Sequence, residues 1–281
     1  MEGSKIKNIV IIILLLLNGF LLVLVGGRWA QDTHSHDAAR SSAIQVIRQS
    51  GIALEEAVVP REMTLGVLEA RRDLTVERTL AAGLLGENMT VEARGGEVYR
   101  YHSPLGWVQF HSTGEFLAEF EPGAFVPDGI TMQEHGANVL ARLGFEAQLL
   151  EDNGKGTLSF RQLVDGVPVL GCQAVLHYEQ DGLVSITGGR RLPGQPQPTG
   201  ERDTLSVATA LMRLYNGMKG LGDIYNRVES IAPAYTMSVS LSGPARLDPV
   251  WYVKTDTGSY QLDTRTGQVS RLGMVGVVQG Q

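Results

Sequence analysis

Histidine and acidic residues gather at one point of the sequence, in a pattern that could bind a metal ion. His34 and His36 are two positions apart, and Asp32 and Asp37 flank them. Imidazole and carboxylate groups bind zinc, but a tetrahedral site needs four ligands that the surrounding structure holds in place. The polar residues around this cluster predict no such support. We therefore expect a solvated stalk over residues 31–37 and no metal site.

The other residues capable of catalysis are scattered. Glu134 and His135 lack the second histidine, one helical turn further on, that a zinc-protease helix requires. The sequence also lacks a phosphate-binding loop, a dinucleotide-binding glycine pattern and a serine-nucleophile elbow. His102, His111 and His177 fall on expected strands, which favours roles in packing. The sequence predicts no catalytic residue, no metal and no cofactor, and thus a protein that binds rather than catalyses.

Composition excludes further classes of protein. The 281 residues carry 24 basic and 30 acidic side chains, a net charge of −6, which argues against a nucleic-acid-binding protein. Hydrophobic residues make up 43% of the chain, as in a globular protein. Cys172 is the only cysteine, so an intramolecular disulfide and a cysteine zinc site are both excluded. A buried free thiol is the simplest role for it.

An uncharged apolar segment lies near the N-terminus. Residues 9–25 read IVIIILLLLNGFLLVLV, and residues 9–27 are long enough to cross most of a membrane as a helix. Lys5 and Lys7 precede the segment, which predicts a cytoplasmic N-terminus at residues 1–8 and an extracytoplasmic remainder. A cleaved signal peptide is the alternative, but its apolar region is usually shorter. Asn18 is costly to expose to lipid; it either hydrogen-bonds a partner helix or is tolerated alone.

The rest of the chain alternates between helical and strand patterns. Apolar periodicity and capping residues predict four helices, at 38–49, 75–86, 131–144 and 204–222. Alternating hydrophobic residues between turn signals predict strands at 63–74, 97–102, 106–111, 115–120, 157–163, 169–178, 183–187, 235–241, 249–255, 259–263 and 268–272. A proline-rich stretch at 193–198 predicts a linker that cannot continue a strand.

This order of elements predicts an α+β fold in which a helix followed by an antiparallel sheet repeats about every 70 residues. The expected domains are an N-terminal α+β domain at 32–130, a middle module at 131–198 and a C-terminal module at 199–281.

Three stretches carry a resemblance to a known family. SKIKNI at 4–9 and LLLNGFLL at 15–22 resemble the N-terminus of YycI proteins, although Glu2 and Gly3 stand where that family usually has Asp and Trp. The block from FRQ at 160–162 to DGVPV at 165–169 also resembles the family. PVWYV, YQLD and TGQV between 249 and 269 are similar to PepSY-type modules, which occur in proteins of several roles.

The YycI resemblance implies a non-enzymatic, single-pass membrane regulator of Gram-positive bacteria. Such proteins, together with YycH-like paralogues, contact the WalK (YycG) sensor histidine kinase and tune a two-component system that controls cell-wall metabolism. The PepSY resemblance implies an alternative, an anchored partner or inhibitor of a secreted hydrolase, including the cortex-lytic type of spore germination. An unrecognised wall enzyme and a structural anchor also remain open.

Five residues are candidates for contact with such a partner. Asn18 and Phe20 lie in the family-like part of the apolar segment. Trp251, Tyr252 and Tyr260 lie on the expected strands of the final module. Their rings either pack the last sheet or present one face to a partner, because aromatic side chains dominate both kinds of contact.

Overall fold

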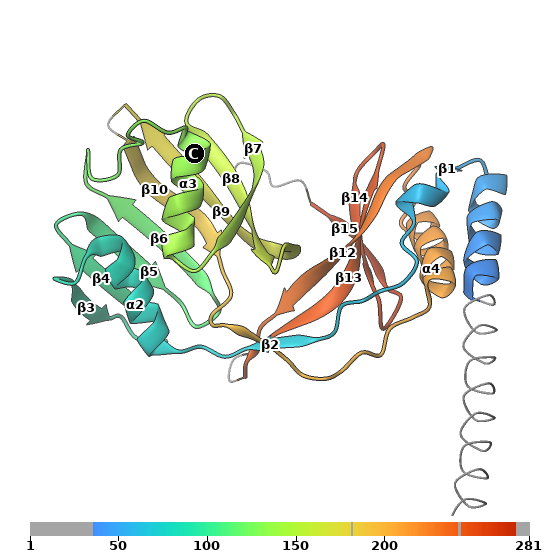
Figure 1. Ribbon diagram of the computed structural model, residues 1–281, viewed down its shortest axis with the longest axis horizontal. Coiled ribbons are helices and arrows are strands. Elements are labelled where there is room, and N and C mark those ends of the chain that lie inside the picture. Colours follow the sequence, from blue (N-terminus) through green and yellow to red (C-terminus); the bar gives the residue numbers. More distant parts are fainter. Residues whose placement is uncertain (1–35, 181, 241–242, 274–281) are drawn as a thin grey trace, which may run out of the picture.

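The computed structural model describes residues 36–180, 182–240 and 243–273, which form an α+β structure of two units (Figure 1). This part of the chain contains four α-helices and a large mixed sheet. None of its helices has the length and apolar character needed to cross a membrane. The predicted span at 9–27, with Asn18 and Phe20, lies outside the described residues.

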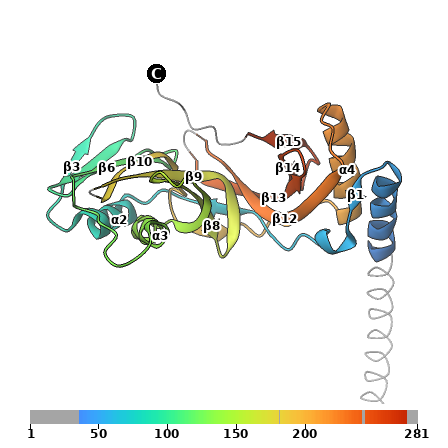
Figure 2. The same ribbon diagram turned by 90° about the horizontal axis from the view of Figure 1, so that it is seen from above.

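The first unit is an eight-stranded antiparallel sheet with two helices on one face (Figures 1 and 2). The helices are α2 (Leu74–Leu85) and α3 (Met132–Arg142). The strands, in spatial order, are β3 (Thr90–Ala93), β4 (Tyr99–Ser103), β5 (Gly106–Phe110), β6 (Glu115–Phe120), β10 (Gly182–Arg190), β9 (Val167–Glu179), β8 (Thr157–Val164) and β7 (Glu146–Asp152). Each half is a helix followed by four strands, so the predicted repeat is present here.

Side-chain hydrogen bonds define where the two helices of this unit begin. Thr131 accepts a hydrogen bond from the backbone of Glu134, whose carboxylate accepts one from the backbone of Thr131. This reciprocal capping box confirms the predicted start of α3. The helix predicted from residue 75 begins one residue earlier, at Leu74, because the carboxylate of Asp73 caps α2 by accepting hydrogen bonds from the backbone N–H groups of Thr75 and Val76.

The core of the first unit lies between its sheet and its helices. Strands β6 and β8 alternate strictly between buried and more exposed residues, as expected for a sheet covered on one side. Phe116, Phe145 and Phe160 are buried in this core. The opposite face of the sheet carries polar and charged side chains such as Arg100 and Arg161, which follow the other phase of the alternation.

The second unit packs two helices against one face of its sheet. These are the helix at residues 36–49 and α4 (Val207–Gly220) (Figure 1). Its other elements are β1 (Ala53–Leu54), the 3₁₀ helix η1 (Glu56–Val58), β2 (Leu68–Ala70), β11 (Pro196–Pro198), β12 (Arg227–Ser238), β13 (Ala245–Thr255), β14 (Ser259–Asp263) and β15 (Val269–Leu272). Ile44 and Ile47 share a core with Leu211 and Leu214.

The domain boundaries predicted from the sequence differ from the two units that the hydrophobic cores define. Residues 43–59 share a core with residues 210–262, whereas residues 81–125 share one with residues 139–186. The range 32–130 therefore contributes to two cores. The first unit is inserted between the two parts of the second, and the chain passes between the units in the segments that contain β2 and β11 (Figure 1).

Strand β9 belongs to both units. Its residues 175–177 pair with both β8 and β10, while Val169 and Leu170 pair in parallel with Tyr235 and Thr236 of β12. Because β1 also pairs in parallel with β12, the expectation of purely antiparallel sheets is wrong for the second unit. The linker expected at 193–198 is also partly a strand, since Pro196–Pro198 pairs with β2 at a sheet edge, where proline is tolerated.

Candidate partner-binding groove

A groove of about 1000 Å³ lies between the two units. Strands β7, β8 and β9 supply one wall, and β13, β14 and β15 with the turn between β13 and β14 supply the other. Figure 1 shows β7 and β15 on the facing sides of the two units. The lining combines leucines at 150, 170 and 272 with hydroxyl groups and charged side chains. Apolar contact surface and polar groups that orient a ligand thus occur together, as in binding sites generally.

Arg161 and Tyr252 meet in this groove from opposite walls. Arg161 stands on β8, and the carbon at the centre of its guanidinium is 5.4 Å from the centroid of the Tyr252 ring on β13. This is cation–π distance. The Nε atom of Arg161 is buried and has no hydrogen-bond partner among the described residues. The hydroxyl groups of Tyr252 and Ser259 are 3.2 Å apart, which orients the tyrosine ring.

The charge of the groove is opposite to that of the chain. Arg161, Lys254 and Arg271 line it together with one carboxylate, that of Glu151, although the chain carries a net charge of −6. Arg271 also forms a salt bridge with Asp223, in which Nη1 of the arginine lies 3.6 Å from Oδ1 of the aspartate. A cationic groove on an acidic protein attracts anionic groups.

The three aromatic candidates of the final module lie in different surroundings. Trp251 is 3% exposed and Tyr260 is fully buried, and both belong to the core beneath α4. The Tyr260 hydroxyl donates to Oδ2 of Asp223 at 2.8 Å, and burial, reinforced by this carboxylate, raises the pKa of Tyr260. Tyr252 points the other way and lines the groove. A partner at the surface therefore reaches Tyr252 first.

Cys172 is fully buried where β9 passes from one unit to the other. Its Sγ atom lies 3.7 Å from the Sδ atom of Met237. Burial raises the pKa of the Cys172 thiol to about 12, so the reactive thiolate is suppressed at neutral pH. This thiol packs rather than reacts.

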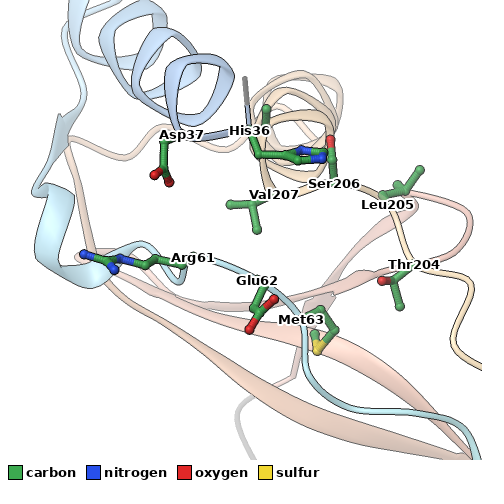
Figure 3. A pocket seen from close by; sticks show the side chains of 10 residues that line it. His36, Asp37, Arg61, Glu62, Met63, Thr204, Leu205, Ser206 and Val207 are labelled. Atoms are coloured by element: carbon green, nitrogen blue, oxygen red, sulfur yellow. The ribbon is translucent and has the colours of Figure 1, made fainter. Parts of the chain in front are cut away.

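A second cavity lies where the helix at 36–49 and α4 begin (Figure 3). His36, Asp37 and Glu62 line this space of about 530 Å³, but the described residues contain no group of three potential ligands placed to hold a metal ion. Ser206 caps α4 by accepting a hydrogen bond from the backbone of Thr209. The hydroxyl is thereby engaged in holding the helix start.

The histidine that the sequence places beside Glu134 also has a structural partner. Nδ1 of His135 lies 2.8 Å from the hydroxyl of Tyr178, and burial, with a smaller effect from Arg142, lowers the pKa of His135. Glu134 is occupied in the capping box of α3. The two adjacent residues therefore serve the packing of one helix on the sheet.

Sequence reasoning missed the groove because its two walls are distant in the chain. The strand alternation could have indicated Arg161. It lies between Phe160 and Gln162, which are both buried, so the arginine must lie on the outer face of the strand. No local pattern indicates that Tyr252, on another strand, stands opposite it.

Part of this region matches a known family. Residues 151–189 match the Fungalysin/Thermolysin Propeptide Motif. The match runs from the end of β7 through β8 and β9 into β10, and it includes Arg161 and the part of β9 that lines the groove. No curated protein matches the chain.

Two solved structures give distant likenesses. An uncharacterized protein from Eubacterium rectale is 14% identical, with 75% of this chain and 87% of that chain covered and a TM-score of 0.45. The C-terminal domain of YpeB from Bacillus megaterium is 12% identical, with 73% and 100% covered and a TM-score of 0.35. These likenesses assign no function to the chain, and the YycI resemblance stays a prediction.

Proposed function

We propose that this protein is a non-enzymatic, membrane-anchored binding protein that contacts a secreted hydrolase outside the cytoplasm and regulates it. The observation that carries the proposal is the match of residues 151–189 to the propeptide motif. A propeptide accompanies an enzyme without supplying its catalytic groups. The matched segment forms one wall of the groove, so the part of the chain that resembles a propeptide also offers a surface for binding.

Residues near the N-terminus support the proposed location. The apolar run at 9–25 and the preceding Lys5 and Lys7 favour an anchor with a cytoplasmic N-terminus. A reporter enzyme fused after Gln281 should then be active only outside the cytoplasm. Recovery of secreted protein whose N-terminus is Arg28 would instead indicate a cleaved signal peptide.

The partner can be identified with the full-length chain. We would crosslink a tagged full-length protein in membranes of its native host, identify the captured proteins by mass spectrometry, and assay each captured hydrolase with and without the purified chain. The proposal expects a secreted hydrolase whose activity changes at least severalfold. A captured hydrolase whose activity is unchanged would contradict regulation.

A sensor histidine kinase of the WalK type, with or without a YycH-like paralogue, is the other partner class that the YycI resemblance implies. Specific capture of a kinase in place of a hydrolase would replace the proposal with that alternative. Exchanging residues 9–25 for an unrelated apolar helix would then show whether Asn18 and Phe20 contribute, because such contacts lie within the membrane.

A further inference from the structure

We propose that the groove binds an extended peptide segment of the partner that carries a carboxylate, and that this segment adds a strand beside β7. The inference rests on the proposed function, because it names the surface and the peptide chemistry that hold the partner. It is carried by three features that meet in the same groove: open strand edges, unpaired positive charge and exposed leucines.

The groove is bordered by a strand edge from each unit. Among the described residues, β7 pairs with β8 alone and β15 pairs with β14 alone. Leu150 and Glu151 of β7 line the groove from one side, and Arg271 and Leu272 of β15 line it from the other. An open strand edge presents unpaired backbone N–H and C=O groups, to which an extended peptide adds by main-chain hydrogen bonds.

The positive charge of the groove selects an acidic segment. Arg161 forms no salt bridge within the described part of the chain, and its guanidinium is held in place over the Tyr252 ring. Lys254 lies on the same wall as Tyr252. A planar guanidinium binds a carboxylate with two parallel hydrogen bonds, which is stronger and more specific than a neutral contact.

Exposed leucines supply the apolar part of the surface. Leu150 of β7 is 37% exposed and Leu272 of β15 is partly exposed, and both line the groove, although most leucines of the first unit are buried. Side chains alternate along an added strand, so an acidic residue directed to Arg161 leaves its neighbours free to contact leucine side chains. The combined surface fits a peptide that alternates acidic and apolar residues.

The test uses the full-length chain in detergent micelles and a phage library of random 12-residue peptides. We expect selection to enrich peptides that combine Asp or Glu with apolar residues. The most enriched peptide, labelled for fluorescence anisotropy, should lose about tenfold in affinity for Arg161→Ala, as expected for a hydrogen bond to a charged group. It should lose a similar factor when its own Asp and Glu become Asn and Gln.

Arg100→Ala is the matched control. Arg100 lies on the same polar face of the first sheet, stacked 3.9 Å from the Trp107 ring, and is remote from the residues that line the groove. Its replacement should leave peptide affinity unchanged. Enrichment of peptides without acidic residues, or equal losses for Arg161→Ala and Arg100→Ala, would overturn the proposal. Since Arg161→Ala could also disturb folding, Arg161→Gln and the melting temperature of each variant distinguish binding from stability.

Hydrogen exchange tests the added strand. Bound peptide should slow amide exchange in residues 146–152 of β7 and leave β3, at the far edge of the same sheet, unchanged. Peptide binding without protection of β7 would overturn strand addition. The peptide experiments and the partner capture test different claims. If acidic peptides bind but the captured partner is not a hydrolase, the groove proposal holds and the proposed function fails. If a hydrolase is captured but acidic peptides do not bind, the proposed function holds and the groove proposal fails.

Discussion

Trp251 and Tyr252 are adjacent on β13 but have different roles, one in stability and the other in binding, and single substitutions should distinguish these roles. Trp251 faces the core and Tyr252 faces the groove, because successive side chains of a strand point to opposite faces. We expect Trp251→Ala to lower the free energy of unfolding by about 3–5 kcal/mol. Tyr252→Ala should weaken partner binding with a much smaller loss of stability. Thermal melts and peptide affinity, measured on both variants, check this; equal destabilisation by both would contradict it.

The thiol of Cys172 should be inert in the native protein. Its pKa of about 12 leaves roughly one molecule in ten thousand as thiolate at pH 8, and the side chain is buried. A thiol reagent such as dithionitrobenzoate should therefore react only after guanidinium unfolds the chain. Rapid reaction of the folded protein would show that the strand between the two units opens readily.

At the scale of elements, two glycines in equivalent helices make a matched pair. A Cβ added at Gly136 of α3 would lie 2.9 Å from Cδ2 of Leu176, whereas one added at Gly83 of α2 has no atom nearer than 4.0 Å. Gly83→Ala should stabilise the protein by up to about 1 kcal/mol through helix propensity. Gly136→Ala should instead destabilise it by about 1–3 kcal/mol by overpacking. Denaturant unfolding measures both, and a gain at both positions would contradict the close packing of α3.

The elements also show what local sequence determines. Capping residues and apolar periodicity predicted α3 at 131–144, and hydrophobic alternation between turn signals predicted most of β10, at 183–187. Strand β7 was missed because almost all of its residues are exposed, so it lacks the alternation that marks a half-buried strand. The exposure reflects its position at the sheet edge, since β7 pairs with β8 alone among the described residues. The pairing of β9 with β12 could not be predicted either, because strand neighbours distant in sequence leave no local pattern.

For the whole molecule, the shared core predicts that the helix at 36–49 stabilises the second unit. Ile44 is 2% exposed and packs with residues of α4, β12 and β13, whereas Val46 on the same helix is 44% exposed. Ile44→Ala should cost about 2–5 kcal/mol, and Val46→Ala less than about 0.5 kcal/mol. Hydrogen exchange should rise in residues 250–262 and stay unchanged in residues 106–120. A rise confined to 106–120 would contradict the shared core.

The insertion of one unit into the other fixes an order of events during synthesis. Leu211 follows Ile47 by 164 positions, so the helix at 36–49 is made long before the surface that buries it. At about 5–20 residues per second, that surface is absent for on the order of 10 to 30 s. The first unit is complete by Arg190 and can fold during this interval. A chain that stalls before α4 would therefore carry a folded unit beside an uncovered apolar helix, which chaperones and proteases recognise.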